Sequence, residues 1–120
     1  MNLLSLILLF AVNLHSPVFI ETDAAQPITV QAGEEFFIAL SANPGTGYSW
    51  KQTMLDDKVV AYEGNVKQPA PQAIPGAPGQ QIFVYHANRS GTATITLTYS
   101  RPWETNAAPA KTLTFNVTVP

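Results

Sequence analysis

The chain has 120 residues, of which 46% are apolar and only 12% are charged, and its formal net charge is −2. This length is enough for one domain that buries a core without covalent cross-links, and six scattered Lys and Arg residues give no basic patch for nucleic acid. The absence of cysteine excludes disulfides, a thiol nucleophile and thiolate metal sites.

Residues 1–24 are predicted to be a leader, followed by one domain at 25–120. The apolar run at 3–12 has the length of a signal-peptide core and is too short to cross a bilayer. Ala24 and Ala25 offer small residues for cleavage, so we expect an exported protein, periplasmic or secreted, with no membrane contact after leader removal. However, no Lys or Arg precedes the run, and it lies far from Ala24. The alternative is that part of this segment, best at 18–20, is a strand of the domain.

The rest of the chain alternates between apolar and polar residues. This period of two predicts strands at 28–31, 48–53, 58–63, 81–87, 92–100 and 112–119. The denser apolar run at 35–42 predicts a further strand, covered on both faces or near a sheet junction. Threonines at alternate positions of the last two strands, with Asn116 as the one exception, indicate a sheet face that contacts water. No window has apolar residues at helical spacing. We therefore predict an all-β protein, an immunoglobulin-like antiparallel β-sandwich of about seven strands.

The connection at 43–48 has the composition of a loop with a fixed shape. Pro44 restricts its own φ and disfavours a helical conformation at the residue before it. Gly45 and Gly47 both tolerate positive φ, so we expect Thr46 to be held between them with its hydroxyl and backbone available. An ordinary turn would use the same residue types, so this loop alone does not indicate function.

Two further connections have unusual compositions. The segment 65–80 contains four prolines and two glycines with almost no periodicity, and a functional loop is expected at 69–80. The connection at 101–104 places Trp103 in a polar setting, where the ring either covers the core or is exposed for binding. In a sandwich of this type the three connections open at one end and form one surface.

The three loops together resemble the chagasin-like inhibitors of papain-type cysteine peptidases, over about residues 27–119. The family pattern is Asn-Pro-Thr-Thr-Gly-aromatic, then Gly-x-Gly-Gly, then Arg-Pro-Trp. The matching positions are Asn43, Pro44, Gly45, Thr46, Gly47 and Tyr48; Gly76, Ala77, Pro78 and Gly79; and Arg101, Pro102 and Trp103. The sequence departs from the family where Gly45 replaces a threonine and where Pro78 replaces a glycine and removes a backbone donor.

The resemblance implies reversible inhibition of papain-like cysteine peptidases by a monomer that needs no cofactor. The first loop would enter the catalytic cleft with Thr46 over the thiolate, and the proline-rich loop would lie along the cleft by strand-like pairing. Arg101 and Trp103 would pack on the opposite, primed side.

Enzymatic activity is not predicted, because the residues for it are missing. The chain has two histidines, His15 in the leader and His86 in a strand, and no carboxylate or histidine cluster with metal-ligand spacing. The remaining alternative is a non-inhibitory secreted binding module for carbohydrate or adhesion. Such a module would use Tyr48, Trp50 and Trp103 as a stacking platform.

Overall fold

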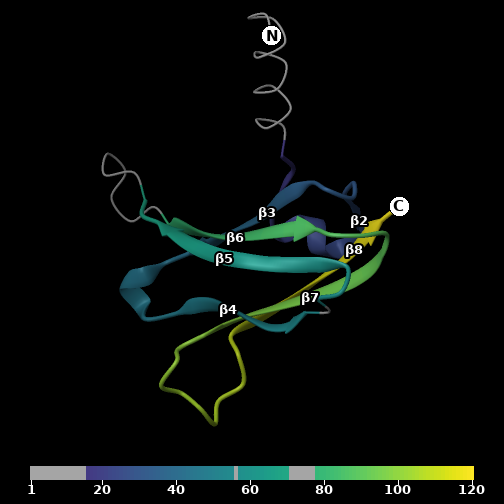
Figure 1. The fold of residues 1–120 in the computed structure, drawn as a ribbon. Helices are drawn as coiled ribbons and strands as arrows, with labels where there is room; N and C mark the ends of the chain where they lie inside the picture. The colour runs from purple at the N-terminus through teal and green to yellow at the C-terminus, as the bar shows by residue number, and fades with distance from the viewer. Residues whose placement is uncertain (1–15, 56, 71–77) are drawn as a thin grey trace, which may run out of the picture.

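Two four-stranded sheets pack face to face in the computed structural model, which describes residues 16–55, 57–70 and 78–120 (Figure 1). The first sheet has the order β1-β3-β6-β5, with β1 at Val18–Phe19, β3 at Glu35–Ala42, β6 at Gly79–Ala87 and β5 at Val60–Gln68. The second has the order β2-β8-β7-β4, with β2 at Ile28–Thr29, β8 at Lys111–Val119, β7 at Gly91–Ser100 and β4 at Ser49–Leu55. The predicted all-β sandwich is confirmed.

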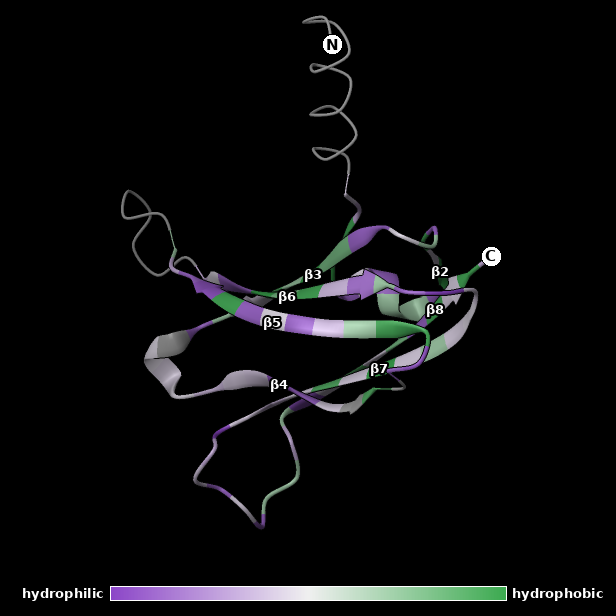
Figure 2. Cartoon of the chain, in the orientation of Figure 1, coloured by the Kyte–Doolittle hydropathy of each residue, from purple (hydrophilic) through white to green (hydrophobic). Residues whose placement is uncertain are grey.

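The core lies between the sheets and comes from alternate residues of each long strand. In β6, Phe83 and Tyr85 are fully buried while Val84 between them is partly exposed, and β7 repeats the pattern with Ile95 and Leu97. Colouring by hydropathy shows hydrophobic and polar positions alternating along the strands (Figure 2). Two-residue periodicity therefore decides which face of each strand is buried.

Two short strands differ from the predicted antiparallel arrangement. The long strands pair antiparallel, whereas β1 pairs parallel with β3, and β2 pairs parallel with β8. Strand β5 also extends beyond the predicted 58–63, so the β5–β6 connection is confined to 69–78. The sheets are thus mixed, with eight strands in the described part of the chain.

Residues 17–25 contact the folded sandwich, and these contacts bear on the predicted leader boundary. Pro17 accepts a hydrogen bond from the Phe37 amide at 2.9 Å, and the ring of Phe19 packs edge-on against Phe36 at 6.1 Å. The 3₁₀ turn η1, Glu21–Ala25, follows, and Glu21 accepts a hydrogen bond from the Ser41 amide. A cut after Ala24 or Ala25 would remove these contacts.

Gln81 joins the two sheets near the loop-bearing end. Its side chain is buried, and it bonds both backbone groups of Trp50 in the opposite sheet, accepting from N at 2.8 Å and donating to O at 2.9 Å. The Trp50 indole donates to the Ser41 carbonyl at 2.9 Å. Because these buried polar groups are paired, they fix the strands on either side of the first loop.

Helical structure in residues 16–55, 57–70 and 78–120 is limited to two 3₁₀ turns, η1 and η2. Within these ranges the structure has no helix long and apolar enough to cross a membrane.

Candidate functional site: three connections at one end of the sandwich

The three predicted loops follow β3, β5 and β7, and the strand directions bring them to one end of the molecule. The connections β3–β4 and β7–β8 are both seen there in Figure 1, and they contact each other directly. Of the β5–β6 connection, the structure describes residues 69, 70 and 78. The predicted site residues Gly76 and Ala77 lie outside the described part of the chain.

The first loop is a closed turn built on Asn43. Residues Pro44–Thr46 form the 3₁₀ turn η2, and the Asn43 carbonyl accepts hydrogen bonds from the Thr46 amide at 3.1 Å and the Thr46 hydroxyl at 2.7 Å. The expectation that this hydroxyl and backbone are available is therefore wrong. The turn instead presents Gly45 and Thr46 as its exposed tip.

Gly47 is the residue of this loop that requires glycine. Its φ is +81°, whereas Gly45 has no positive φ and sits within η2, so only one of the two predicted positions is left-handed. A β-carbon on Gly47 would lie 2.4 Å from Cη2 of Trp103. Glycine here serves both the backbone conformation and the close approach of that ring.

Three aromatic rings pack in succession between the first loop and the core. Tyr48 stacks on Tyr99 at 5.2 Å between ring centroids, and Tyr99 packs on Trp50 at 4.9 Å. The Tyr99 hydroxyl accepts a hydrogen bond from the Asn43 amide at 3.1 Å. Since Tyr99 and Trp50 are buried, both ends of the first loop are anchored in the core.

Arg101 connects the third connection to the first. Its Nε donates to the Thr46 carbonyl at 3.1 Å, and its Nη1 donates to Glu104 at 3.2 Å. The guanidinium carbon lies 4.5 Å from the centroid of the Tyr48 ring. The side chain is thus engaged within the chain on three sides.

Trp103 is exposed and does not cover the core. Its relative exposure is 67%, and the edge of its six-membered ring lies against Gly47. The alternative in which this ring caps the sandwich is therefore wrong. Pro102 beside it is also exposed, so the two residues extend the surface formed by the tip of the first loop.

At the two ends of the second connection, the backbones of Gln68 and Gly79 lie close together. Gly79 is buried, and a β-carbon there would lie 2.4 Å from the Gln68 carbonyl oxygen. Pro78 is exposed. Of these two predicted site residues, only Pro78 lies on the surface, while Gly79 permits β5 and β6 to approach where the connection begins.

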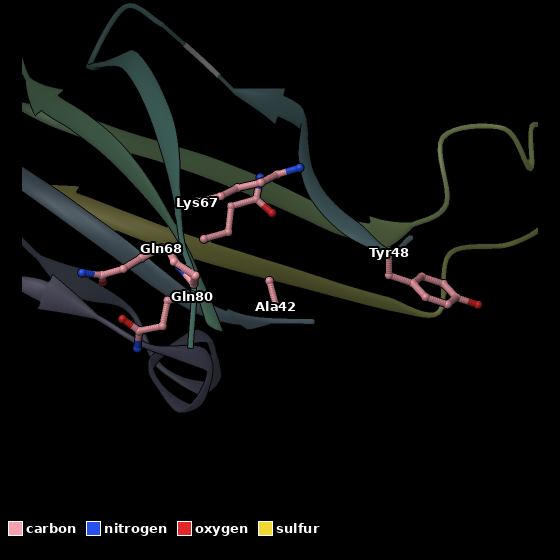
Figure 3. Close-up of a pocket in the computed structure, with 7 residues that line it drawn as sticks. Ala42, Tyr48, Lys67, Gln68 and Gln80 are labelled. Atoms are coloured by element: carbon pink, nitrogen blue, oxygen red, sulfur yellow. The ribbon is translucent and has the colours of Figure 1, made fainter. Parts of the chain in front are cut away.

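A small cavity of about 110 Å³ lies between the first loop and the ends of β5 and β6. Ala42, Lys67, Gln68 and Gln80 line it together with Tyr48, whose ring points away from the others in Figure 3. Small-molecule sites usually have about 300–1,000 Å³, so this cavity does not indicate a ligand pocket. The exposed features of this end suit a protein partner better.

The titratable groups give no support for catalysis at this surface. Across the ranges that the structure describes, no three His, Asp or Glu residues are grouped to hold a metal. Burial raises the pKa of Tyr85, with a smaller contribution from Tyr62, but Tyr85 lies in the core and donates to Gln52 at 2.7 Å. This perturbed group is structural.

Comparison with known proteins identifies the family. Residues 29–119 match the model of the Chagasin family peptidase inhibitor I42. Amoebiasin-1 of Entamoeba histolytica is 38% identical over 96 residues, which cover 77% of this chain and 88% of that protein. Chagasin of Trypanosoma cruzi is 31% identical over 81 residues, covering 63% and 73% respectively. The crystal structure of EhICP2, a cysteine protease inhibitor from Entamoeba histolytica, superposes with a TM-score of 0.74 at 27% identity, covering 88% of this chain and 98% of that one.

The chain therefore belongs to the chagasin family of peptidase inhibitors. It is a cysteine protease inhibitor, as the sequence resemblance implied, and its family consists of inhibitors and not of enzymes.

Proposed function

We propose that this end of the sandwich blocks the active-site cleft of papain-type cysteine peptidases, with the first loop inserted and the other two connections on either side. The observation that carries the proposal is that Thr46 and Trp103 are both exposed at this end. The loop that carries Thr46 is held by Tyr48, which stacks on the buried Tyr99. A loop held in shape before binding loses little conformational entropy on docking. The proposed contacts are Gly45, Thr46, Pro102 and Trp103, with Pro78 at the second connection.

The closed geometry of the first loop supports inhibition without cleavage. The Thr46 amide and hydroxyl are both bonded to the Asn43 carbonyl, so the backbone is a tight turn. A peptidase cleaves an extended segment that pairs with its cleft as a strand. The turn would have to open before its peptide bonds could adopt that conformation.

The experiment that tests this proposal is titration of papain with the full chain, followed by mass measurement of the inhibitor. We expect reversible inhibition at one-to-one stoichiometry and recovery of the intact chain. Rapid cutting between Asn43 and Tyr48 with return of peptidase activity would overturn the inserted-loop assignment. Absence of inhibition at large excess would overturn the function itself.

The rival binding module needs an aromatic platform that the residues do not form. Trp50 is only 3% exposed and stacks in the core, so it does not share a surface with Trp103. Tyr48 is partly covered by Arg101. This arrangement favours the inhibitor.

Export is part of the proposal, with cleavage placed upstream of Ser16. The apolar run at 3–12 supports a signal peptide. The contacts of Pro17, Phe19 and Glu21 with β3 support a mature chain that retains these residues. Expression in a secreting host and mass measurement of the exported chain would test this. A mature chain starting at Ala25 or Gln26 would contradict the placement, and retention of residues 1–15 would contradict cleavage.

A further inference from the structure

Arg101 makes three contacts within the chain at a surface where a peptidase would bind. Its Nε donates to the Thr46 carbonyl, its Nη1 donates to Glu104, and its guanidinium carbon lies 4.5 Å from the centroid of the Tyr48 ring. The side chains of Arg101 and Glu104 are each 36% exposed. The positive charge is thus partly neutralised and partly covered before any partner approaches.

The carbonyl contact is distinctive because of where it holds the first loop. Within the described residues, the other hydrogen bonds of Thr46 return to the loop itself, to Asn43 and the Tyr48 amide. Contacts with Tyr99 anchor the loop at Asn43 and Tyr48, its two ends. The Arg101 bond is the hydrogen bond that ties the tip itself to another part of the fold, 55 residues away in sequence.

We propose that Arg101 is a positioning residue, which holds the tip of the first loop in its inhibitory shape instead of contacting the peptidase. This inference rests on the proposed function, because it concerns the same loop. It changes the role that the sequence resemblance implied for Arg101, which was packing on the primed side of the cleft. Trp103 and Pro102 then remain as the exposed contacts of the third connection.

The geometry requires an arginine. One planar group donates from Nε to a carbonyl, donates from Nη1 to a carboxylate and lies at cation–π distance from an aromatic ring. A lysine ammonium keeps the positive charge but has no planar fork and no face to stack. Arg101→Lys should therefore release the loop although the charge is preserved, whereas a residue recognised mainly by its charge would tolerate this change.

The first test measures the loop in the free inhibitor, without any peptidase. Amide hydrogen exchange in the full chain would be compared for wild type, Arg101→Lys and the control Arg89→Ala, whose arginine lies in the β6–β7 turn at the other end of the sandwich. We expect the Thr46 amide to exchange about tenfold faster in Arg101→Lys and unchanged in Arg89→Ala, because a tenfold shift needs only about 1.4 kcal/mol. Unchanged exchange in Arg101→Lys would overturn the proposal whether or not the protein inhibits papain.

The second test separates positioning from direct contact. Arg101→Lys and Arg101→Ala would be measured against papain in the wild-type chain and again in Thr46→Gln, where a bulky neutral side chain prevents insertion of the tip. We expect each change to weaken inhibition about tenfold in the wild-type chain and less than about twofold in the Thr46→Gln chain, since coupled residues are not additive. An equal loss of inhibition in both backgrounds would mean that Arg101 contacts the peptidase directly. Full inhibition by Arg101→Lys would mean that the arginine geometry has no role in holding the loop. If wild type itself fails to inhibit, the proposed function falls, while hydrogen exchange still decides the role of Arg101.

Discussion

The two tryptophans of this chain give a paired test of the interface. Trp103 is 67% exposed and Trp50 is 3% exposed, although both lie near the same end of the sandwich. A tryptophan has roughly 250 Å² of surface, so the fold covers roughly 80 Å² of Trp103, worth at most about 2 kcal/mol at 25 cal/mol per Å². Trp103→Ala should therefore lower the free energy of unfolding by no more than about 2 kcal/mol. Trp50→Ala should lower it by about 3–5 kcal/mol, because it also empties part of the core.

Binding should reverse the order of the two effects. The exposed part of Trp103, roughly 170 Å², offers up to about 4 kcal/mol if a peptidase covers it, and we expect Trp103→Ala to weaken inhibition by about 2 kcal/mol or more. Urea unfolding and papain inhibition would be measured on the same preparation of each variant. The reasoning is refuted if Trp103→Ala destabilises the fold as much as Trp50→Ala and leaves inhibition intact.

Three other changes test other parts of the structure. Thr46→Glu should weaken papain inhibition by about 2 kcal/mol or more, because docking would bury an unpaired carboxylate. Its free energy of unfolding should change by less than about 0.5 kcal/mol, because the residue is exposed. Unchanged inhibition would contradict insertion of the loop. A chain starting at Gln26 should lose about 1–2 kcal/mol of unfolding free energy through loss of the packing of the partly buried Phe19 alone, whereas one starting at Ser16 should keep it; equal stability would contradict a structural role for β1. Because burial raises the pKa of Tyr85, stability should fall as the pH rises above about 10, where the unfolded tyrosine ionises first, and Tyr85→Phe should reduce this loss in pH-dependent urea unfolding; an identical alkaline loss in Tyr85→Phe would contradict it.

The strands could be predicted from the sequence because burial leaves a periodic trace. Ile95 and Leu97 alternate with threonines, and the structure buries the former and leaves the threonine side partly exposed. Strand β1 could not be found with the same certainty, because two residues are too few to show a period. Its place is set by pairing with Phe37 and Ile38, which are distant in the sequence.

The loops of the site could be located from the sequence, but their internal contacts could not. Proline and glycine mark the connection at 43–48, yet they do not show that Thr46 would bond back to Asn43. The tie between Arg101 and Thr46 depends on how β3 and β7 are placed in different sheets. Composition shows that Trp103 is in a loop. Its exposure, however, depends on where the fold places Gly47, against which the ring lies.

The bonds between Gln81 and Trp50 also affect how the molecule meets other molecules in solution. Strand β4 lies at the border of its sheet, where unpaired backbone groups invite another strand to add and aggregates to grow. At Trp50 both backbone groups are already occupied by the Gln81 amide, which acts as a substitute for a neighbouring strand. This part of the border is therefore closed to strand addition. At Trp50 the chain therefore offers no free backbone group with which a second copy of itself could pair.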